Sequence, residues 1–333
     1  MNIREKREAW EKDFLNPFAA RSAESIGRKS NEEKCEIRTE YQRDKDRITH
    51  SKAFRRLMHK TQVFIAPEGD HYRTRLTHTM EVVQIARTIT RALNLNEDLA
   101  EAIALGHDLG HTPFGHTGED ALNQLLEDGF RHNEQSVRVV EYIEKNGNGL
   151  NLTFEVLDGI LNHRTQNSPL TLEGKIVQIS DKIAYMNHDV DDAIRAKILA
   201  PDDLPKHFID ILGDTPSNRI GFFVSNLVKN SIPDEKKITL STEITAVMSD
   251  LRSFMFKNVY VNGLHFKERS KIDKMLHLLF EHYLINPHKL PAEYKARMEE
   301  SPTHAVADYI AGMTDRFALK QFGQIFMPSA WGM

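Results

Sequence analysis

The chain has 333 residues, of which 40% are hydrophobic and 28% are charged, so it can build a sizeable core and general disorder is excluded. Its formal net charge of −4 gives the surface as a whole no attraction for nucleic acid. A single cysteine excludes a disulfide framework or a cysteine-based zinc site within one chain. The charged N-terminus lacks a signal-peptide run, and no stretch of about 18 apolar residues is present. We therefore expect a cytoplasmic protein without a membrane span.

Apolar residues recur every three or four positions along most of the chain, a spacing typical of buried helix faces. This spacing predicts a helix through residues 82–93. It also predicts a helix after Asn96, whose side chain can act as the N-cap and which should end near Gly110. After a glycine-rich segment, a short helix with Thr117 in a loose capping box should stop at Gly129.

Further apolar stripes predict helices over residues 133–143, 172–183, 244–255, 275–284 and 306–317. Convincing alternating strands are scarce, and proline-containing segments after residue 200 are typical of connections between helices. The sequence therefore predicts an all-α protein.

A change in composition near residue 200 separates a motif-rich half from a plainer helical half. We expect an N-terminal helical segment over residues 1–40 and a core over residues 41–200. A helical C-terminal region, residues 201–333, should pack on this core.

Several common catalytic motifs are missing from the sequence. There is no phosphate loop of the G-x-x-x-x-G-K-[ST] type and no G-x-G-x-x-G dinucleotide fingerprint. There is also no G-x-S-x-G nucleophile elbow and no H-E-x-x-H zinc helix. Histidine and carboxylate chemistry remains.

Four residues in three short segments are candidate metal ligands. "RLTHTMEV" contains His78, "GHDLG" contains His107 and Asp108, and "ISDKIAY" contains Asp181. Neutral imidazoles combined with carboxylates suit divalent first-row metals. A lone histidine or aspartate on a helix is more often a solvated residue. The adjacent pair follows the apolar run "AIAL", however, where a buried carboxylate needs a charged partner, either an arginine or a metal.

The helix expected around Asp181 has an unusual polar face. Asp181, Tyr185, His188, Asp189 and Asp192 share this face by their three- and four-residue spacing. A polar face is normal for a surface helix, but this one is short of lysine and glutamate. It is equally compatible with the lining of a site.

The H…HD…D pattern resembles that of the HD-domain metal-dependent phosphohydrolases. Within them, "YQRDKDRITHSKAFRRLMHKTQVF", "TRLTHTMEV", "GHDLGHTPFGHTGE", "FRHNEQS" and "SDKIAY" resemble the deoxyguanosine triphosphate triphosphohydrolase family. The resemblance covers residues 41–192, and "DYIAGMTDRFAL" resembles that family's tail. It implies an HD-domain helical fold with additional C-terminal helices. It also implies a divalent metal held by His78, His107, Asp108 and Asp181.

The family's reaction is water attack on the α-phosphorus of a deoxynucleoside triphosphate (dNTP), which releases the deoxynucleoside and intact triphosphate. The resemblance implies that His116 is catalytic and that Glu119 orients it. It places His132 at the α-phosphate or the leaving group. We assign His111 either a loop-structuring role or a role in supporting the neighbouring site residues.

The resemblance also implies residues that bind the substrate. Arg75 and Lys182 match phosphate-binding positions. Tyr185 and Asp189 match the lining of the deoxyribose pocket, where a tyrosine ring would exclude a 2′-hydroxyl. Gln62 matches a residue that contacts the sugar 3′-hydroxyl.

Several alternatives stay open. The chain could be another HD phosphohydrolase, such as a 5′-nucleotidase or a phosphodiesterase, or a catalytically silent protein that binds nucleotide or nucleic acid. Mg²⁺ and Mn²⁺ are the expected metals, and Fe²⁺ and Ni²⁺ also suit the ligands. We expect a dNTP substrate, and the resemblance extends to a dNTP activator and a homo-oligomer. Single-stranded nucleic acid binds some relatives but gains no support from the net charge.

Overall fold

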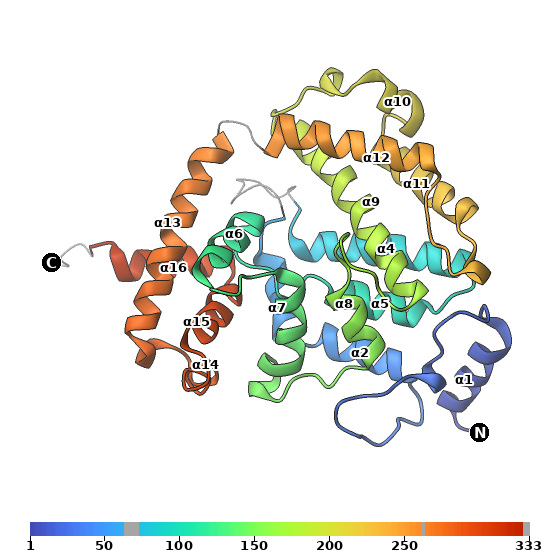
Figure 1. Cartoon of the computed structure of the whole chain (residues 1–333), viewed down its shortest axis with the longest axis horizontal. Coiled ribbons are helices and arrows are strands. Elements are labelled where there is room, and N and C mark those ends of the chain that lie inside the picture. The colour runs from blue at the N-terminus through green and yellow to red at the C-terminus, as the bar shows by residue number, and fades with distance from the viewer. Residues whose placement is uncertain (63–72, 261–263, 329–333) are drawn as a thin grey trace. The chain divides into compact units, whose positions relative to one another are not determined.

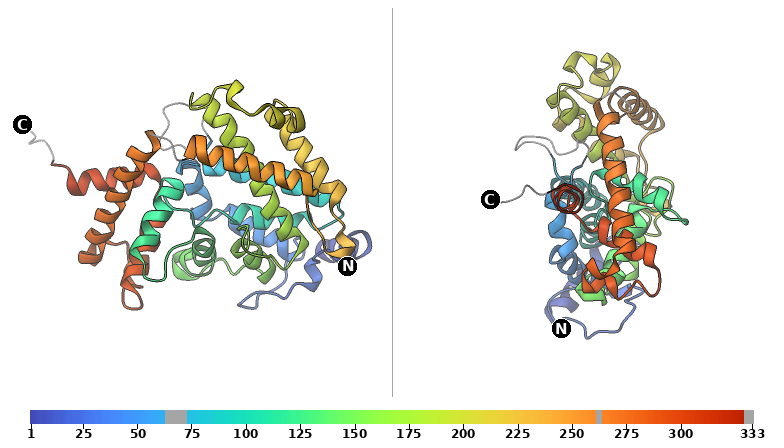
Figure 2. Two further views of the ribbon diagram at one scale, coloured as in Figure 1. Left: turned by 45° about the horizontal axis from the view of Figure 1, so that its top comes forward. Right: turned by 90° about the vertical axis from the view of Figure 1, so that its left-hand side faces the viewer.

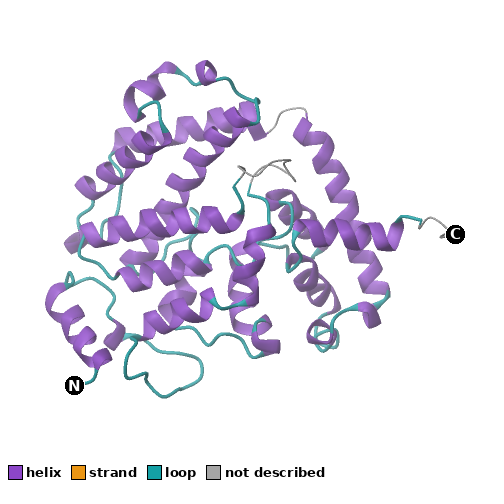
Figure 3. Cartoon of the chain, turned by 180° about the vertical axis from the view of Figure 1, so that it is seen from behind, coloured by secondary structure: helices purple, strands orange, loops and turns teal. Residues whose placement is uncertain are grey.

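A computed structural model describes residues 1–62, 73–260 and 264–328. The chain divides into two compact units, here called unit 1 and unit 2, which we describe separately. Unit 1 comprises residues 1–50, 78–107 and 150–263, and unit 2 comprises residues 51–77, 108–149 and 264–333. Among the described residues the elements are helices joined by loops (Figure 3), and extended pairing is confined to isolated bridges. The prediction of an all-α protein is confirmed.

Unit 1 holds the helices predicted through residues 82–93, after Asn96, and over residues 172–183 and 244–255 (Figure 1). Its elements are α1 (Ile3–Phe14), η1 (Ser22–Glu24), α2 (Glu40–Thr49), α4 (Arg75–Ala92, from His78 on), α5 (Glu97–Gly106), α8 (Phe154–Leu161), α9 (Leu172–Arg195), η5 (Pro201–Asp203), α10 (Lys206–Leu212), α11 (Pro216–Asn230), η6 (Pro233–Glu235), α12 (Thr242–Met255) and the π-turn η7 (Phe256–Tyr260).

Unit 2 holds shorter helices together with the C-terminal ones (Figure 1). They are α3 (Lys52–Arg56), η2 (Leu57–His59), α6 (Gly115–Leu125), α7 (His132–Arg138), the π-turn η3 (Val139–Ile143), η4 (Lys145–Gly147), α13 (Leu264–Ile285), η8 (Pro287–Lys289), α14 (Ala292–Lys295), α15 (Pro302–Ala311) and α16 (Asp315–Phe326).

The core of unit 1 forms around α5, which packs against α2, α8 and α9 (Figures 1 and 2). The helix begins as expected, because the Asn96 side chain accepts hydrogen bonds from the backbone N–H groups of Asp98 and Leu99. Every residue from Leu99 to Gly106 except Glu101 is buried. The part of α5 after Glu101 is apolar on all sides and lies inside the protein, so the C-terminal end of the helix is buried.

Several expected helix boundaries are wrong. The helix predicted over residues 306–317 is divided into α15 and α16, and the helix expected to stop at Gly129 ends at Leu125. The helix after Asn96 ends at Gly106 rather than near Gly110, because the chain turns at residues 107–110 and the His111 N–H bonds to the Asp108 carbonyl three residues back. The next helix begins at Gly115 with Phe114 as N-cap. Thr117 therefore lies inside the helix and forms no capping box.

Buried carboxyl groups tie the N-terminal segment to the core of unit 1. Glu11 accepts hydrogen bonds from the backbone N–H and the hydroxyl of Ser22 at 2.7 and 2.9 Å. Glu173, in the first turn of α9, accepts from the backbone N–H groups of Asn96 and Ala20 at 2.9 and 3.1 Å. These bonds fix the start of α5 against the start of α9.

No helix in the described part of the chain combines the length and the apolar character needed to cross a bilayer. The apolar stripes of the later helices are buried as expected at Ile244, Met255, Leu276 and Val306. Phe317, at the end of the last predicted stripe, is instead 39% exposed.

Glu173 should make the stability of the protein depend on pH. Burial raises the pKa of its carboxyl to about 7, although the backbone N–H groups of Asn96 and Ala20 oppose this. The unfolded chain ionises near pH 4.5, so the free energy of unfolding should fall on the order of 3 kcal/mol between that pH and pH 7. Glu173→Gln, which stays neutral, should match the wild type near pH 4.5 and be more stable at pH 8.

Chemical unfolding at the two pH values measures this difference. Glu299→Gln, which removes an exposed carboxylate, is the matched control and should change stability little at either pH. A Glu173→Gln variant with the same pH dependence as the wild type would contradict the assignment.

Candidate active site

Three of the predicted metal ligands converge within unit 1. His78 lies in the first turn of α4, His107 caps the end of α5, and Asp181 lies in the middle of α9. The Nε2 atoms of His78 and His107 lie 3.1 and 3.9 Å from Asp181 Oδ1, and the two rings are 5.7 Å apart. Both histidines are buried. Three helices thus bring two imidazoles and a carboxylate to one point.

The backbone selects the tautomer of His107. Its Nδ1 lies 2.6 Å from the Ala104 carbonyl oxygen, and because a carbonyl can only accept, Nδ1 carries the proton. The lone pair of the neutral ring is therefore on Nε2, the atom that faces Asp181. His163 is held in the same way by the Ile160 carbonyl at 2.7 Å, and its ring lies 5.2 Å from His107. Such backbone bonds orient histidines that ligate metals.

The electrostatics of Asp181 fit a cation site. Burial favours its neutral form, but the hydrogen bond with His78 and the proximity of His107 and His163 outweigh burial and lower the pKa of Asp181. Its carboxyl is therefore ionised at neutral pH. An ionised carboxylate beside two imidazole nitrogens is a donor set that suits a divalent metal.

Asp108 follows His107 through a peptide bond and begins unit 2. Within that unit Arg75 donates from Nη1 to Asp108 Oδ2 at 2.7 Å, and both side chains are buried. Asp108 was expected to have either an arginine or a metal as its charged partner, and Arg75 is such an arginine. Arg75 Nη2 also donates to the backbone carbonyl of Gln62 at 3.4 Å. The Gln62 side-chain carbonyl is buried and has no partner among the described residues.

The predicted catalytic residues form a second cluster, within unit 2. Glu119 Oε2 lies 3.1 Å from His116 Nδ1. Glu119 Oε1 accepts hydrogen bonds from the backbone N–H of His132 at 3.0 Å and from its Nδ1 at 2.9 Å. The His116 side chain is 76% exposed, whereas those of Glu119 and His132 are 10% exposed. One buried carboxylate thus holds two imidazoles, one of which reaches solvent.

Glu119 remains ionised in this position. Burial favours the neutral carboxyl, but the hydrogen bonds from His116 and His132 outweigh it and hold the pKa of Glu119 well below its ordinary value. Because an ionised carboxylate can only accept, Nδ1 of His116 donates to it. The other ring nitrogen of neutral His116, Nε2, then carries the lone pair and can act as a general base.

His111 belongs to the same cluster. Its ring stacks on His132 at 4.7 Å and lies 5.3 Å from His116. Burial, together with Arg75 and His132, lowers the pKa of His111 well below its ordinary value, so the ring is neutral. Its Nδ1 has no hydrogen-bond partner among the described residues. Donor atoms of His111 lie within 4.8 Å of those of His132 and Asp108, and also of those of His116 and Glu119.

The glycines between His107 and Glu119 let the backbone pack closely. A Cβ on Gly110 would lie 2.1 Å from the backbone nitrogen of Ser136, and one on Gly118 would lie 2.1 Å from the Pro113 carbonyl oxygen. Any side chain at these positions would push the loop apart. The glycine density therefore serves the compact placement of the histidines.

The predicted substrate residues of α9 lie along one face within unit 1. Burial raises the pKa of Tyr185 to about 12, against the effect of Arg252, so its hydroxyl is neutral. Burial and the positive charge of Arg252 lower the pKa of Lys182, while Asp181 opposes this. Asp189, one turn beyond Tyr185, is buried.

Two residues near the predicted ones, Arg252 and His163, were missed, and a third was given no role. Arg252 lies on α12, which packs against α9, and its charge acts on Lys182 and Tyr185. His163 lies beside His107. His188 was noticed on the face of α9 but given no role, and its Nδ1 lies 3.0 Å from a Glu81 oxygen. No motif pointed to Arg252 or His163, because only tertiary packing brings them near the site.

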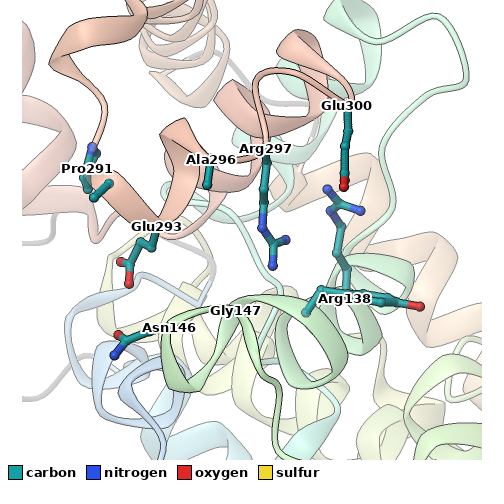
Figure 4. Close-up of a pocket in the computed structure, with 10 residues that line it drawn as sticks. Arg138, Asn146, Gly147, Pro291, Glu293, Ala296, Arg297 and Glu300 are labelled. Atoms are coloured by element: carbon teal, nitrogen blue, oxygen red, sulfur yellow. The ribbon is translucent and has the colours of Figure 1, made fainter.

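Unit 2 also has a hollow of about 880 Å³ apart from this cluster (Figure 4). It is lined by residues of α7, η3, η4 and α14 and of the segment after α14, including Arg138, Glu293, Arg297 and Glu300. Figure 4 shows the arginine and glutamate side chains on its walls. The formal charges of its two arginines and two glutamates cancel, so this lining does not favour an anion.

Comparison with known proteins gives a consistent assignment. An HD domain matches residues 75–186 and a phosphohydrolase-associated domain matches residues 238–324, which confirms the predicted HD domain. A deoxyguanosinetriphosphate triphosphohydrolase-like protein from Caldanaerobacter subterraneus subsp. tengcongensis is 58% identical and covers 99% of this chain and 98% of the relative. A protein of the same name from Clostridium perfringens is 52% identical over 98% of each chain. A crystal structure of a hypothetical protein from Aquifex aeolicus is 18% identical, with a TM-score of 0.46, and covers 85% of this chain and 71% of that one.

Measurements of metal affinity should distinguish the two clusters. Asp181→Asn removes the charge that faces His78 and His107, and we expect the affinity for Mn²⁺ to fall by about tenfold or more. His116→Ala, in the other cluster, should leave Mn²⁺ affinity close to that of the wild type. Equilibrium dialysis followed by elemental analysis measures both, without reference to activity. An equal loss of metal in the two variants would show that the assignment of His116 is wrong.

Proposed function

The chain belongs to the family of deoxyguanosinetriphosphate triphosphohydrolase-like proteins, and on this basis we propose that it hydrolyses deoxynucleoside triphosphates. The proposed reaction is water attack at the α-phosphorus, with release of the deoxynucleoside and inorganic triphosphate. The observation that carries the proposal is the pairing of His116 and His132 with one ionised carboxylate, Glu119.

A divalent cation completes the proposed site. His78, His107, Asp108 and Asp181 would hold it, with Mg²⁺ or Mn²⁺ expected first and Fe²⁺ or Ni²⁺ also compatible. When bound, such a cation polarises a phosphate oxygen and lowers the pKa of a water molecule. The backbone bond that leaves the lone pair of His107 on Nε2 supports this use of the ligands.

The remaining chemistry falls to the residues of the second cluster. His116, oriented by Glu119, would take the proton from water or give one to the departing 5′-oxygen. His132 is held by the same carboxylate, and we assign its ring to the α-phosphate or the leaving oxygen. A positioned acid or base of this kind contributes roughly 10²–10⁴-fold to a rate.

Triphosphate carries several negative charges, which need cationic partners. We assign Arg75 and Lys182 to the phosphates, as the resemblance implies. Arg252 joins this set because its charge already acts on Lys182. Burial and a neighbouring cation disfavour the charged form of a lysine, and a bound anion nearby would stabilise that form.

We assign Tyr185 and Asp189 to the deoxyribose and Gln62 to its 3′-hydroxyl. Tyr185 is half-buried and neutral, so its ring can form a wall against the 2′ position without a charge. The buried side-chain carbonyl of Gln62 can accept a hydrogen bond from a hydroxyl. A dNTP activator, a homo-oligomer and a cytoplasmic location stay predictions.

Analysis of the phosphate products tests the proposal. The purified protein is incubated with Mn²⁺ or Mg²⁺ and each dNTP, alone and in pairs, and the products are separated by ion exchange. We expect triphosphate from the wild type and none from His116→Ala. Monophosphate or pyrophosphate would instead favour a 5′-nucleotidase or a phosphodiesterase. No product under any condition would favour a silent nucleotide-binding protein.

Tyr185→Ala should weaken the discrimination against ribonucleotides. A pocket wall that excludes a hydroxyl sterically supplies up to about 10²-fold discrimination, so we expect the ratio of kcat/KM for dNTP over rNTP to fall by about tenfold. Tyr142→Ala, which alters an exposed tyrosine of unit 2, is the control and should leave the ratio unchanged. An unchanged ratio in Tyr185→Ala would refute the sugar wall.

A further inference from the structure

The segment Asp308–Asp315, "DYIAGMTD", joins α15 to α16 and has no role in the proposed reaction. It belongs to unit 2, in the red part of the chain in Figure 1. Three of its residues accept hydrogen bonds that connect the segment to His111, His116 and His132. Two of them bond to the loop before α6 or to α7, and the third bonds to Lys60, which also donates to the His111 carbonyl. These residues are the two aspartates at its ends and Ala311, the last residue of α15.

The first anchor is Asp315, the first residue of α16. Its Oδ1 accepts a hydrogen bond from the Phe114 N–H at 3.0 Å. Its Oδ2 accepts from the Thr61 N–H at 3.0 Å and from the Thr61 hydroxyl. Phe114 is the N-cap of α6, has a φ of 61° and precedes His116 by two residues. A non-glycine residue in this left-handed conformation is costly and needs such support.

The second anchor is Lys60, a lysine that is only 2% exposed. Its Nζ donates to the Ala311 carbonyl at 2.7 Å and to the carbonyl of His111. Ala311 ends α15, so this amine meets the negative end of a helix. Lys60 therefore links the His111 backbone to the same segment. A buried amine with such partners is costly to lose, because both carbonyl oxygens would be left unsatisfied.

The third anchor is Asp308, on α15, which is 2% exposed. It accepts hydrogen bonds from Gln135 Nε2 at 2.9 Å and from Arg138 Nε at 2.7 Å. Both donors lie on α7, the helix that begins at His132. This bond set holds α7 along its length and so fixes the position of its first residue.

We propose that the segment Asp308–Asp315 is a positioning element that sets the spacing of His111, His116 and His132. The groups bonded at the three anchors include the Phe114 N–H, the His111 carbonyl and the Gln135 side chain, which lie within three residues of His116, His111 and His132 along the chain. The two aspartates and Ala311, the second acceptor of Lys60, all lie in this one short segment. The role rests on the proposed function, since the histidines matter only if they act on one substrate. A displacement of about 1 Å in such a cluster costs about 10²-fold in rate.

Asp315→Asn is the principal test. Asp315 accepts from Phe114 and from Thr61 with different oxygens. In asparagine an NH₂ group replaces one of these oxygens, so it would face a donor N–H and that hydrogen bond would be lost. We expect kcat to fall by about tenfold or more with little change in KM or bound Mn²⁺. Amide hydrogen exchange over residues 109–118 should become faster. Asp308→Asn should lower kcat as well, with faster exchange at the start of α7.

Controls separate positioning from general loss of stability. Glu299→Gln removes an exposed carboxylate from unit 2 and should leave kcat, KM and exchange unchanged. If Asp315→Asn does not fold, Thr61→Ala, which removes only the hydroxyl donor, provides the same test with a smaller expected fall in kcat.

The proposal is overturned if a folded Asp315→Asn protein keeps wild-type kcat, or keeps wild-type exchange over residues 109–118. It is equally overturned if only the melting temperature falls while kcat per metal-loaded site is unchanged. If the wild type releases no triphosphate, the proposed function fails. The exchange measurement then decides separately whether the segment holds the loop.

Discussion

The ionised carboxylate of Glu119 is the interaction on which the candidate active site depends. Burial alone would neutralise it, and a neutral carboxyl could not hold two imidazoles by accepting from both. The hydrogen bonds from His116 and His132 keep the carboxylate ionised. The ionised carboxylate in turn holds both imidazoles in place. Removing either imidazole would leave a buried charge short of partners, which is far costlier than losing an exposed one.

A similar rule governs the other buried polar groups of unit 2. Lys60 is satisfied by two backbone carbonyls, Asp315 by two backbone N–H groups and a hydroxyl, and Asp308 by Arg138 and Gln135. Buried polar groups need complete sets of partners, and a complete set permits only a few arrangements of the backbone. Satisfying these groups therefore helps to fix the loop before α6 and the helix α7.

Sequence reasoning predicted the features that local chemistry controls. Asn96 caps its helix as expected, because the capping bond spans only a few residues. The end of that helix at Gly106 and the start of α6 at Gly115 were placed wrongly, because i→i+3 bonding at His111 and the left-handed φ of Phe114 depend on the surrounding fold. Arg252 was missed for the same reason, since nothing near it in the sequence signals its approach to α9.

The role of the tail motif depends on contacts that its sequence does not reveal. "DYIAGMTD" was recognisable as a family feature, but its letters alone assign no chemistry: an aspartate at either end of a helix junction is usually a cap or a solvated charge. Burial of Asp308 and Asp315, and the origin of their donors on α7 and at Phe114, change that interpretation. A carboxylate that accepts from the backbone two residues before His116 constrains the position of that histidine, however far away the carboxylate lies in the sequence.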